Sequence, residues 1–308
     1  MSEETAPEDF SDCCIKIHPL IKSGEKQVKH MVISGGAFTG LVYYGAMREL
    51  NKHKQWKLEN IKSIYGTSVG TLFSVIIALD YEWEIIDDYL IKRPWQNIFK
   101  ATTLALIDSL VTKMGMYTNK IFEDFLNPLF AGKDVDVNIT LKEFYELNGI
   151  ELHMYTTELN TFKMIDISYK THPDWRVVDA VYCSSCLPII FTPFLHENCA
   201  YADGGLFSNY PLQQCLAAIE DPIEILGTYR ILPKNVTKIK PDSTILDYLS
   251  VLLNEIVDRI LMCQQTTTVG IECALPGVST EFSVVAQLLS SPEERRKYMD
   301  IGASYLHR

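Results

Sequence analysis

A serine flanked by glycines is the first residue whose surroundings indicate catalysis. Ser68 lies in the stretch GTSVG, residues 66–70. This is the spacing of a nucleophile elbow, in which a serine is held on a tight turn between a strand and a helix. Gly66 and Gly70 are small enough to let that strand and helix approach each other closely. The alternative is an ordinary hydroxyl in a glycine-rich turn, because so short a pattern recurs in unrelated chains.

A second glycine-rich stretch, SGGAFTG at residues 34–40, precedes the elbow in the sequence. Glycines let backbone N–H groups point into a shared hole at the start of a helix, where they can bind an anion. Nucleotide binding is the competing interpretation, but the stretch has neither the G-x-G-x-x-G pattern nor a following lysine and hydroxyl residue. The loop therefore fits serine chemistry, which needs donors for an oxyanion as well as a nucleophile.

The base that takes the proton of Ser68 must come from elsewhere in the chain. None of the seven histidines lies late in the chain at a strand-to-loop junction, where a three-residue hydrolase needs one. Asp203 is a better candidate, because two glycines follow it and leave room around its carboxylate. The alternatives are an ordinary Asp-Gly turn and a triad in which His196 or His172 is the base.

Together these motifs resemble the patatin-like phospholipases, a family that uses a Ser–Asp dyad. The resemblance covers residues 28–215 and the last helix, EERRKYMDIGASYL. The stretch AVYCSSCLPIIF at 180–191 is also similar to the family's serine-rich helix before a proline and an aromatic residue. The positions that match the family's motifs are Gly35, Gly36, Ala37, Gly40, Gly66, Ser68, Gly70, Asp203, Gly204, Gly205, Asn209 and Pro211.

The resemblance implies a two-step acyl transfer. Ser68 would attack an ester carbonyl and Asp203 would accept its proton. The N–H groups of Gly35, Gly36 and Ala37 would stabilise the oxyanion. Water would then hydrolyse the acyl-enzyme, with no cofactor and no metal. An acyltransferase that passes the acyl group to another alcohol, and a non-catalytic lipid-binding protein on the same fold, are the alternatives.

Two positions differ from the pattern of the family. Ala37 replaces the usual third glycine but still offers a backbone N–H. Thr39 replaces the usual arginine or lysine, and so removes a cation that could hold a lipid phosphate. The sequence therefore leaves open whether phospholipid or neutral lipid is preferred.

The elements predicted around these motifs alternate between strands and helices. Strands are predicted at 30–34, 61–65, 151–157, 161–167 and 223–226, and helices at 41–53, 69–79 and 176–185. The remainder reads as mainly helical, and its last helix begins after Ser291, an N-cap residue followed by proline and glutamate. This alternation predicts an α/β fold, a three-layer sandwich with a mainly parallel central sheet.

The chain has no internal repeat and no convincing linker. We therefore predict one patatin-like catalytic domain at 28–308, with the core motifs at 28–215 and a helical part at 240–308. The preceding segment, 1–27, is acidic, and we expect it to be partly disordered because its start has few large apolar groups.

The segment 81–131, which follows the elbow helix, has no strand pattern and reads as a helical insertion with breaks at Pro94 and Gly115. Its bulky apolar residues are Trp83, Trp95, Ile98, Phe99, Leu104, Leu106, Met114 and Met116. They either fill a core or form a cover that contacts lipid. We predict a cover that exposes Trp95 and Phe99, because the net charge of −11 disfavours attachment by charge alone.

The composition is typical of a soluble, acidic enzyme. A net charge of −11 argues against nucleic-acid binding, which needs clustered Lys and Arg. The N-terminus lacks the apolar core of a signal peptide, and no apolar run is long enough to span a bilayer. We therefore expect a cytoplasmic protein that meets its lipid at a membrane or lipid-droplet surface, through peripheral contact.

Eight cysteines in a chain without a secretory signal are expected to be reduced. Cys183 and Cys186 have the spacing of a redox or zinc half-site. A zinc site would need a second pair, and none follows with that spacing. We therefore expect these two cysteines to be buried thiols.

Overall fold

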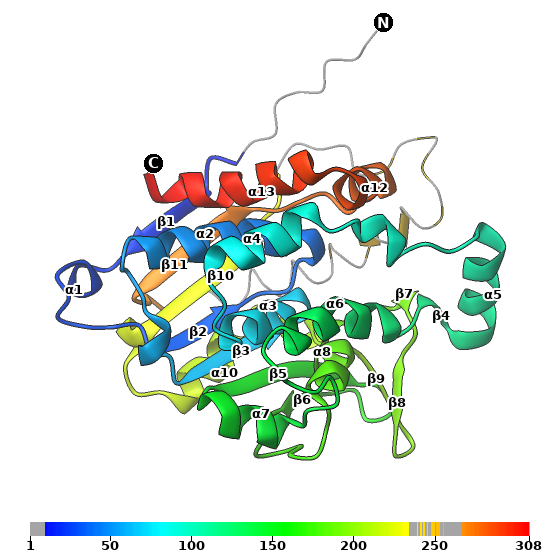
Figure 1. The fold of residues 1–308 in the computed structure, drawn as a ribbon, viewed down its shortest axis with the longest axis horizontal. Coiled ribbons are helices and arrows are strands. Elements are labelled where there is room, and N and C mark those ends of the chain that lie inside the picture. Colours follow the sequence, from blue (N-terminus) through cyan, green and yellow to red (C-terminus); the bar gives the residue numbers. More distant parts are fainter. Residues whose placement is uncertain are drawn as a thin grey trace, which may run out of the picture.

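A computed structural model of the chain describes residues 10–233 and 267–307, together with isolated positions between 239 and 255. The first nine residues of the predicted disordered segment lie outside the described residues, and so does much of the predicted helical part at 240–308. Figure 1 shows the described elements arranged around one central sheet. The predicted class, a mixed α/β fold with a mostly parallel central sheet, is confirmed.

Nine strands of the described chain form this sheet, in the order β1-β11-β10-β2-β3-β5-β9-β8, with β6 paired to β5. Five run in the same direction: β11 (Ile271–Pro276), β10 (Ile225–Ile231), β2 (His30–Ile33), β3 (Ser63–Thr67) and β5 (Glu151–Glu158). Antiparallel strands extend the sheet: β1 (Cys14–Ile17), β6 (Lys163–Ile167), β9 (Cys199–Asp203) and β8 (Phe194–His196). Because parallel strands end at the same edge, the segments that follow β2 and β3 are brought together there.

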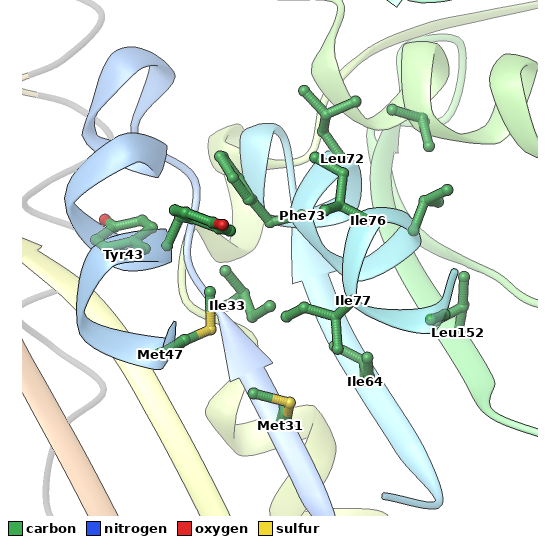
Figure 2. Packing of buried hydrophobic residues seen from close by; sticks show 14 of the residues in the cluster. Met31, Ile33, Tyr43, Met47, Ile64, Leu72, Phe73, Ile76, Ile77 and Leu152 are labelled. Carbon is green, nitrogen blue, oxygen red and sulfur yellow. The ribbon is translucent and has the colours of Figure 1, made fainter. Parts of the chain in front are cut away.

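Helices cover both faces of the sheet. On one side lie α2 (Gly40–Lys52), α3 (Val69–Ala78), α4 (Trp83–Lys92), α8 (Val177–Ser185) and α13 (Pro292–Ser304), and on the other lies α10 (Leu212–Ala218). Met31 and Ile33 of β2 belong with Met47 of α2 to the larger core cluster (Figure 2). Val32, which points the opposite way, packs in a smaller cluster with Leu212 of α10. The central strands read as continuous apolar runs because both of their faces are buried.

The sequence does not predict several elements, each of which depends on a distant partner. β11 lies where a helical remainder was expected, and it forms between β10 and β1. β4 (Gly115–Tyr117) lies in the segment expected to hold no strand, and it pairs with β7 (Ile189–Phe191). Both expectations are wrong, because short strands show little periodicity of their own. Four further helices of the described residues are α1 (Pro19–Lys22), α7 (Leu141–Asn148), α9 (Gly205–Ser208) and α12 (Phe282–Ser290).

The segment 81–131 is an insertion of helices, as predicted, but its large aromatic residues are not its exposed ones. Its helices are α4, α5 (Thr103–Lys113) and α6 (Lys120–Ala131). Trp95 is only 5% exposed. Its indole N–H donates to the carbonyl oxygen of Leu90 at 2.7 Å, its ring stacks on Phe125, and Phe99 is half-buried. The predicted exposed cover of Trp95 and Phe99 is therefore wrong. Burying a large aromatic ring between helices stabilises the fold more than leaving it exposed to water.

Apart from Ile85 on α4, the exposed large apolar residues of the insertion lie on and directly after α5. They are Leu104, Ile107, Val111 and Met114, and they are 78%, 55%, 77% and 57% exposed. We call these four residues the α5 face. No residue of α5 is buried, and the helix stands at one end of the molecule, apart from the helices that cover the sheet (Figure 1).

None of the described helices combines the length and the apolar composition that a crossing of the bilayer would require.

The contact between α2 and α13 depends on two glycines. A Cβ atom on Gly45 would lie 1.9 Å from the carbonyl oxygen of Met299, and one on Gly302 would lie 1.9 Å from that of Val42. Both clashes are with backbone atoms, which cannot move aside without separating the helices. The two glycines thereby fix the position of α2, whose first turn directly follows the loop at 34–40.

Replacing Gly45 with alanine should lower the free energy of unfolding by at least about 2 kcal/mol, because the methyl group overpacks the helix contact. This loss outweighs the gain of roughly 1 kcal/mol in helix propensity. Urea unfolding measures the difference. Lys52→Ala, on the exposed end of the same helix, is the control, and its effect should stay within about 0.5 kcal/mol. Similar values for the two variants would contradict a close approach of α2 and α13 at their glycines.

Candidate active site

Ser68 occupies the turn that the sequence predicts for it. β3 ends at Thr67 and α3 begins at Val69, and between them Ser68 has φ 54° and ψ −127°. A positive φ is strained for a residue with a side chain and typical of a nucleophile elbow. A Cβ atom on Gly70 would lie 2.1 Å from the carbonyl oxygen of Ile33, so this turn lies directly against the end of β2.

The backbone of Ser68 is held by Ser184, a residue of α8. The Ser68 N–H donates to the Ser184 hydroxyl oxygen at 3.0 Å, and that hydroxyl donates to the carbonyl oxygen of Tyr155 at 2.5 Å. Ser184 is fully buried. It lies in the serine-rich helix that the sequence marks only by its resemblance to the family, so a positioning role for Ser184 was missed. This contact engages the Ser68 N–H, which therefore does not face an oxyanion.

Asp203, the last residue of β9, points its carboxylate at Ser68. The two side chains form a hydrogen bond, and the Gly205 N–H donates to Asp203 Oδ1 at 2.7 Å. Burial raises the pKa of the Asp203 carboxyl to about 6. The hydrogen bonds from Ser68 and Gly205 and the charge of the buried Arg230 act in the opposite direction and only partly offset the burial. A carboxylate with a pKa in this range is a far better base than an ordinary aspartate.

The glycine after Asp203 is required by the backbone around it. A Cβ atom on Gly204 would lie 2.1 Å from the carbonyl oxygen of Tyr155, in the neighbouring strand. The Gly204 N–H donates to the carbonyl oxygen of Ser184 at 3.1 Å, and the Thr157 hydroxyl donates to the carbonyl oxygen of Asp203 at 2.9 Å. β5 and α8 thus fix the aspartate on both sides.

The loop at 34–40 lies beside the elbow, and its first glycine is fully engaged. The Gly35 N–H donates to the carbonyl oxygen of Asn209 at 2.8 Å. The Gly35 carbonyl oxygen accepts from the Ser34 hydroxyl at 2.9 Å and from the Tyr43 hydroxyl at 3.2 Å. A Cβ atom on Gly35 would lie 3.2 Å from the Cβ of Ser68. Gly35 therefore packs directly against the serine, and its N–H is occupied.

Gly36 and Ala37 are donors of this loop that remain available. Within residues 10–233 and 267–307, neither N–H has a hydrogen-bond partner. They precede the first turn of α2, where unpaired N–H groups and the positive end of the helix dipole favour an anion. Ala37 has φ 48°, the left-handed region that a glycine would occupy without strain.

Thr39, which stands where the family usually has a cation, is fully buried. Its hydroxyl accepts a hydrogen bond from the Val278 N–H at 3.0 Å. The side chain at this position therefore faces the interior, where it ties the loop to the segment after β11.

The histidines proposed as alternative bases have other partners. The rings of His172 and His196 lie 4.6 and 4.9 Å from that of Trp175, measured between centroids. No contact of either ring with Ser68 or Asp203 is present among the residues that the structure describes.

The thiols of Cys183 and Cys186 are buried and free, in agreement with the expectation for these two cysteines. Burial raises the pKa of Cys186 to about 12 and that of Cys183 well above its ordinary value. The Cys186 thiol donates to the carbonyl oxygen of Tyr201 at 3.2 Å. Protonated thiols of this kind are neither metal ligands nor nucleophiles at neutral pH.

Comparison with known proteins agrees with the motifs. The sequence profile of the family described as "Patatin-like phospholipase" matches residues 31–216. The chain belongs to this family. A protein of Acanthamoeba polyphaga mimivirus, named uncharacterized protein R571, is 29% identical over 191 residues, which cover 62% of the chain and 62% of that protein. A protein of Invertebrate iridescent virus 6, named probable lipid hydrolase 463L, is 27% identical over 192 residues, which cover 61% and 63%.

The chain thus matches somewhat less than two thirds of the length of these two relatives. Two solved structures with more distant sequences are also similar. VipD from Legionella pneumophila has a TM-score of 0.48 at 14% identity, over 97% of this chain and 72% of VipD. Full-length ExoU from Pseudomonas aeruginosa, in complex with SpcU, has a TM-score of 0.40 at 14% identity, over 91% of this chain and 52% of ExoU.

Asp203→Asn should raise the stability of the protein at neutral pH, because it removes a buried charge. The pKa of Asp203 is about 6 in the folded state and 3.8 for a free side chain. This difference corresponds to a loss of roughly 3 kcal/mol in the free energy of unfolding when the carboxyl ionises. The unfolded state loses this proton first as the pH rises. The contribution of Asp203 to the stability of the wild-type protein is therefore complete below about pH 4, where the side chain is protonated in both states. It is lost between about pH 4 and pH 6. Urea unfolding from pH 4 to 8 should show the two proteins diverging over that window, in favour of the variant.

Asp108→Asn, which removes an exposed carboxylate on α5, is the matched control, and its difference from wild type should change little over the same window. A difference between wild type and Asp203→Asn that does not vary with pH would contradict the raised pKa of Asp203.

Proposed function

We propose that this chain is a lipid acyl hydrolase that cleaves fatty-acyl esters with Ser68 as nucleophile and Asp203 as base. One observation carries the proposal: a buried carboxylate, with its pKa raised to about 6, is hydrogen-bonded to a serine in a strained elbow. Membership of the patatin-like phospholipase family supports the reaction class. The name of the iridovirus relative, a probable lipid hydrolase, supports it as well.

In the first step, Ser68 Oγ bonds to the ester carbonyl carbon as its proton passes to the Asp203 carboxylate. The carbonyl oxygen becomes an oxyanion that accepts hydrogen bonds from the N–H groups of Gly36 and Ala37, with further stabilisation from the start of α2. The tetrahedral intermediate then expels the alcohol, which takes the proton from Asp203. An acyl ester on Ser68 remains.

In the second step, water attacks the acyl group while Asp203 accepts a proton from it. The carbon–Oγ bond breaks, Ser68 regains its proton from Asp203, and the fatty acid leaves. An alcohol in place of water would make the same site an acyltransferase. The two activities therefore differ only in which acceptor reaches the acyl-enzyme.

We propose for Gly35 a different part in this scheme from that of Gly36 and Ala37. Its N–H is bound to the carbonyl oxygen of Asn209, and its carbonyl oxygen accepts two hydroxyl donors. A fixed Gly35 peptide orients the two following N–H groups, so Gly35 and Asn209 are positioning residues.

We expect Ser68 to react with a fluorophosphonate, because the elbow holds its hydroxyl beside unpaired N–H donors. Ser68→Ala should abolish labelling, while Ser290→Ala, which replaces a serine at the end of α12, should label like wild type.

Asp203→Asn should lower kcat by about 10²- to 10⁴-fold, because this is the contribution of a positioned base. In wild type, kcat/KM on a soluble ester should rise with pH through about 6 and then level off.

Hydrolysis of a mixed lipid extract, followed by mass spectrometry, identifies the products in the same variants, and an added alcohol tests for acyl transfer. His172→Ala and His196→Ala should stay within about tenfold of wild type, roughly 1.4 kcal/mol in the barrier. A large loss in His196→Ala, with Asp203→Asn still active, would instead support a triad.

We further propose that the α5 face is the surface that meets lipid. The helix stands at the end of the molecule toward which the parallel strands point (Figure 1). The strand after it, β4, pairs with β7, and β7 follows Cys186, whose carbonyl oxygen accepts the Asp203 N–H at 3.1 Å. The α5 face is thereby linked to the candidate site by a short, hydrogen-bonded path. Insertion of its apolar side chains into lipid needs no positive net charge.

Leu104→Gln and Val111→Gln should lower hydrolysis of lipid vesicles at least severalfold, because each removes an exposed apolar contact from the α5 face. Hydrolysis of a soluble short-chain ester and the melting temperature should not change, since neither side chain is buried. Leu147→Gln, an equally apolar and 58% exposed position on α7, is the control and should behave like wild type. Equal losses on vesicles and on the soluble ester would count against the α5 face.

A further inference from the structure

Two histidines and a glutamate far from Ser68 converge on one point of the surface. Glu49 Oε1 lies 3.2 Å from Nε2 of His53 and 3.2 Å from Nε2 of His307. The three ligand atoms all lie within 4.8 Å of one another. Both imidazoles thus turn the same nitrogen toward the same carboxylate oxygen.

These residues come from two elements that are held together independently of the cluster. Glu49 lies in the last turns of α2 and His53 is its C-cap, while His307 lies in the short turn of helix that follows α13. The two helices are already fixed by the backbone contacts of Gly45 and Gly302. The helix backbones that carry the three side chains are therefore already in place when a ligand binds.

The donor set and its spacing suit a transition-metal ion. Two imidazole nitrogens and one carboxylate oxygen are ligands that Zn²⁺ accepts, with bonds of about 2.0–2.1 Å. In a tetrahedral site with such bonds, neighbouring ligand atoms lie about 3.3 Å apart, which is close to the two distances measured here. We propose that Glu49, His53 and His307 form a Zn²⁺ site, with water completing the coordination.

Another histidine of the chain shows what distinguishes this cluster from ordinary ion pairing. His153 also has two carboxylate neighbours, Glu151 at 3.3 Å and Asp166 at 2.8 Å. Those carboxylates contact different ring nitrogens, Nε2 and Nδ1, and therefore lie on different sides of the imidazole. They cannot bind one ion together with the ring. At Glu49, the carboxylate is shared by two rings that present equivalent nitrogens.

The site would act on structure and not on the ester chemistry. Along α2, which begins at Gly40, a helix rises 1.5 Å per residue, so Glu49 and His53 lie about 14 and 20 Å from the loop at 34–40. A bound ion would join the end of α2 to the segment after α13. The exposed fractions of the side chains, 50% for His53, 20% for Glu49 and 57% for His307, give the ion direct access from solvent.

Titration of the metal-free protein with Zn²⁺ tests the proposal, with calorimetry for binding and thermal unfolding for stability. At a hundredfold excess over Kd, Zn²⁺ should raise the melting temperature by about 3–5 °C. His53→Gln and His307→Gln should each weaken the binding at least tenfold and remove most of this shift. His172→Gln, a partly exposed histidine outside the cluster, should bind Zn²⁺ like wild type.

Co²⁺ distinguishes this site from binding by the cysteines that are not fully buried. Bound at His, His and carboxylate, Co²⁺ should give visible d–d bands without a thiolate-to-metal charge-transfer band. The proposal is overturned if Zn²⁺ produces no saturable binding, if binding persists in His53→Gln and His307→Gln, or if the Co²⁺ spectrum shows thiolate ligation. Hydrolysis of a soluble ester should be the same with and without Zn²⁺, so a failure here would leave the Ser68–Asp203 proposal unaffected.

Discussion

Burial of the Asp203 carboxylate is the constraint on which the candidate site depends. The side chain is 4% exposed and ends β9 inside a shell made by β5, α8 and the elbow. Taking a carboxylate out of water is unfavourable, and it is this penalty that raises the pKa. The hydrogen bonds from Ser68 and Gly205 are too few to cancel it. The aspartate is thereby kept basic where it touches the serine, at the expense of stability, as is common for functional sites.

The same neighbours that bury Asp203 also fix the serine and the glycine loop. Ser184 binds the Ser68 N–H through its hydroxyl and the Gly204 N–H through its carbonyl oxygen, so one residue of α8 holds the backbone at Ser68 and next to Asp203. Asn209, which follows the aspartate by six positions, holds the Gly35 N–H. Parallel strands end at one edge of the sheet, which is why segments far apart in sequence can share these contacts.

The parts of this arrangement that the sequence predicts are those with local causes. The elbow at 66–70 is set by glycines two residues on either side of Ser68, and the helix after it by a continuous apolar run. β11 and the β4–β7 pair depend on strand partners more than 40 residues away in the sequence. No local pattern therefore predicts them. The sequence places Trp95 at the surface incorrectly, because composition alone does not show which bulky side chains pack against other helices. The engagement of the Gly35 N–H likewise depends on Asn209, which only folding brings beside it.

Because Thr39 is buried, the positive potential at the candidate site comes from backbone N–H groups and not from the side chain at this position. Its hydroxyl is bound to the Val278 N–H, and its side chain has no exposed surface. A long cationic side chain at this position would have to leave the interior or lose its hydration there, at a high cost in free energy. In the proposed mechanism the oxyanion therefore relies on fixed N–H dipoles at the start of α2. These dipoles act over short distances, so they favour charge at the reacting carbonyl more than charge on a distant head group.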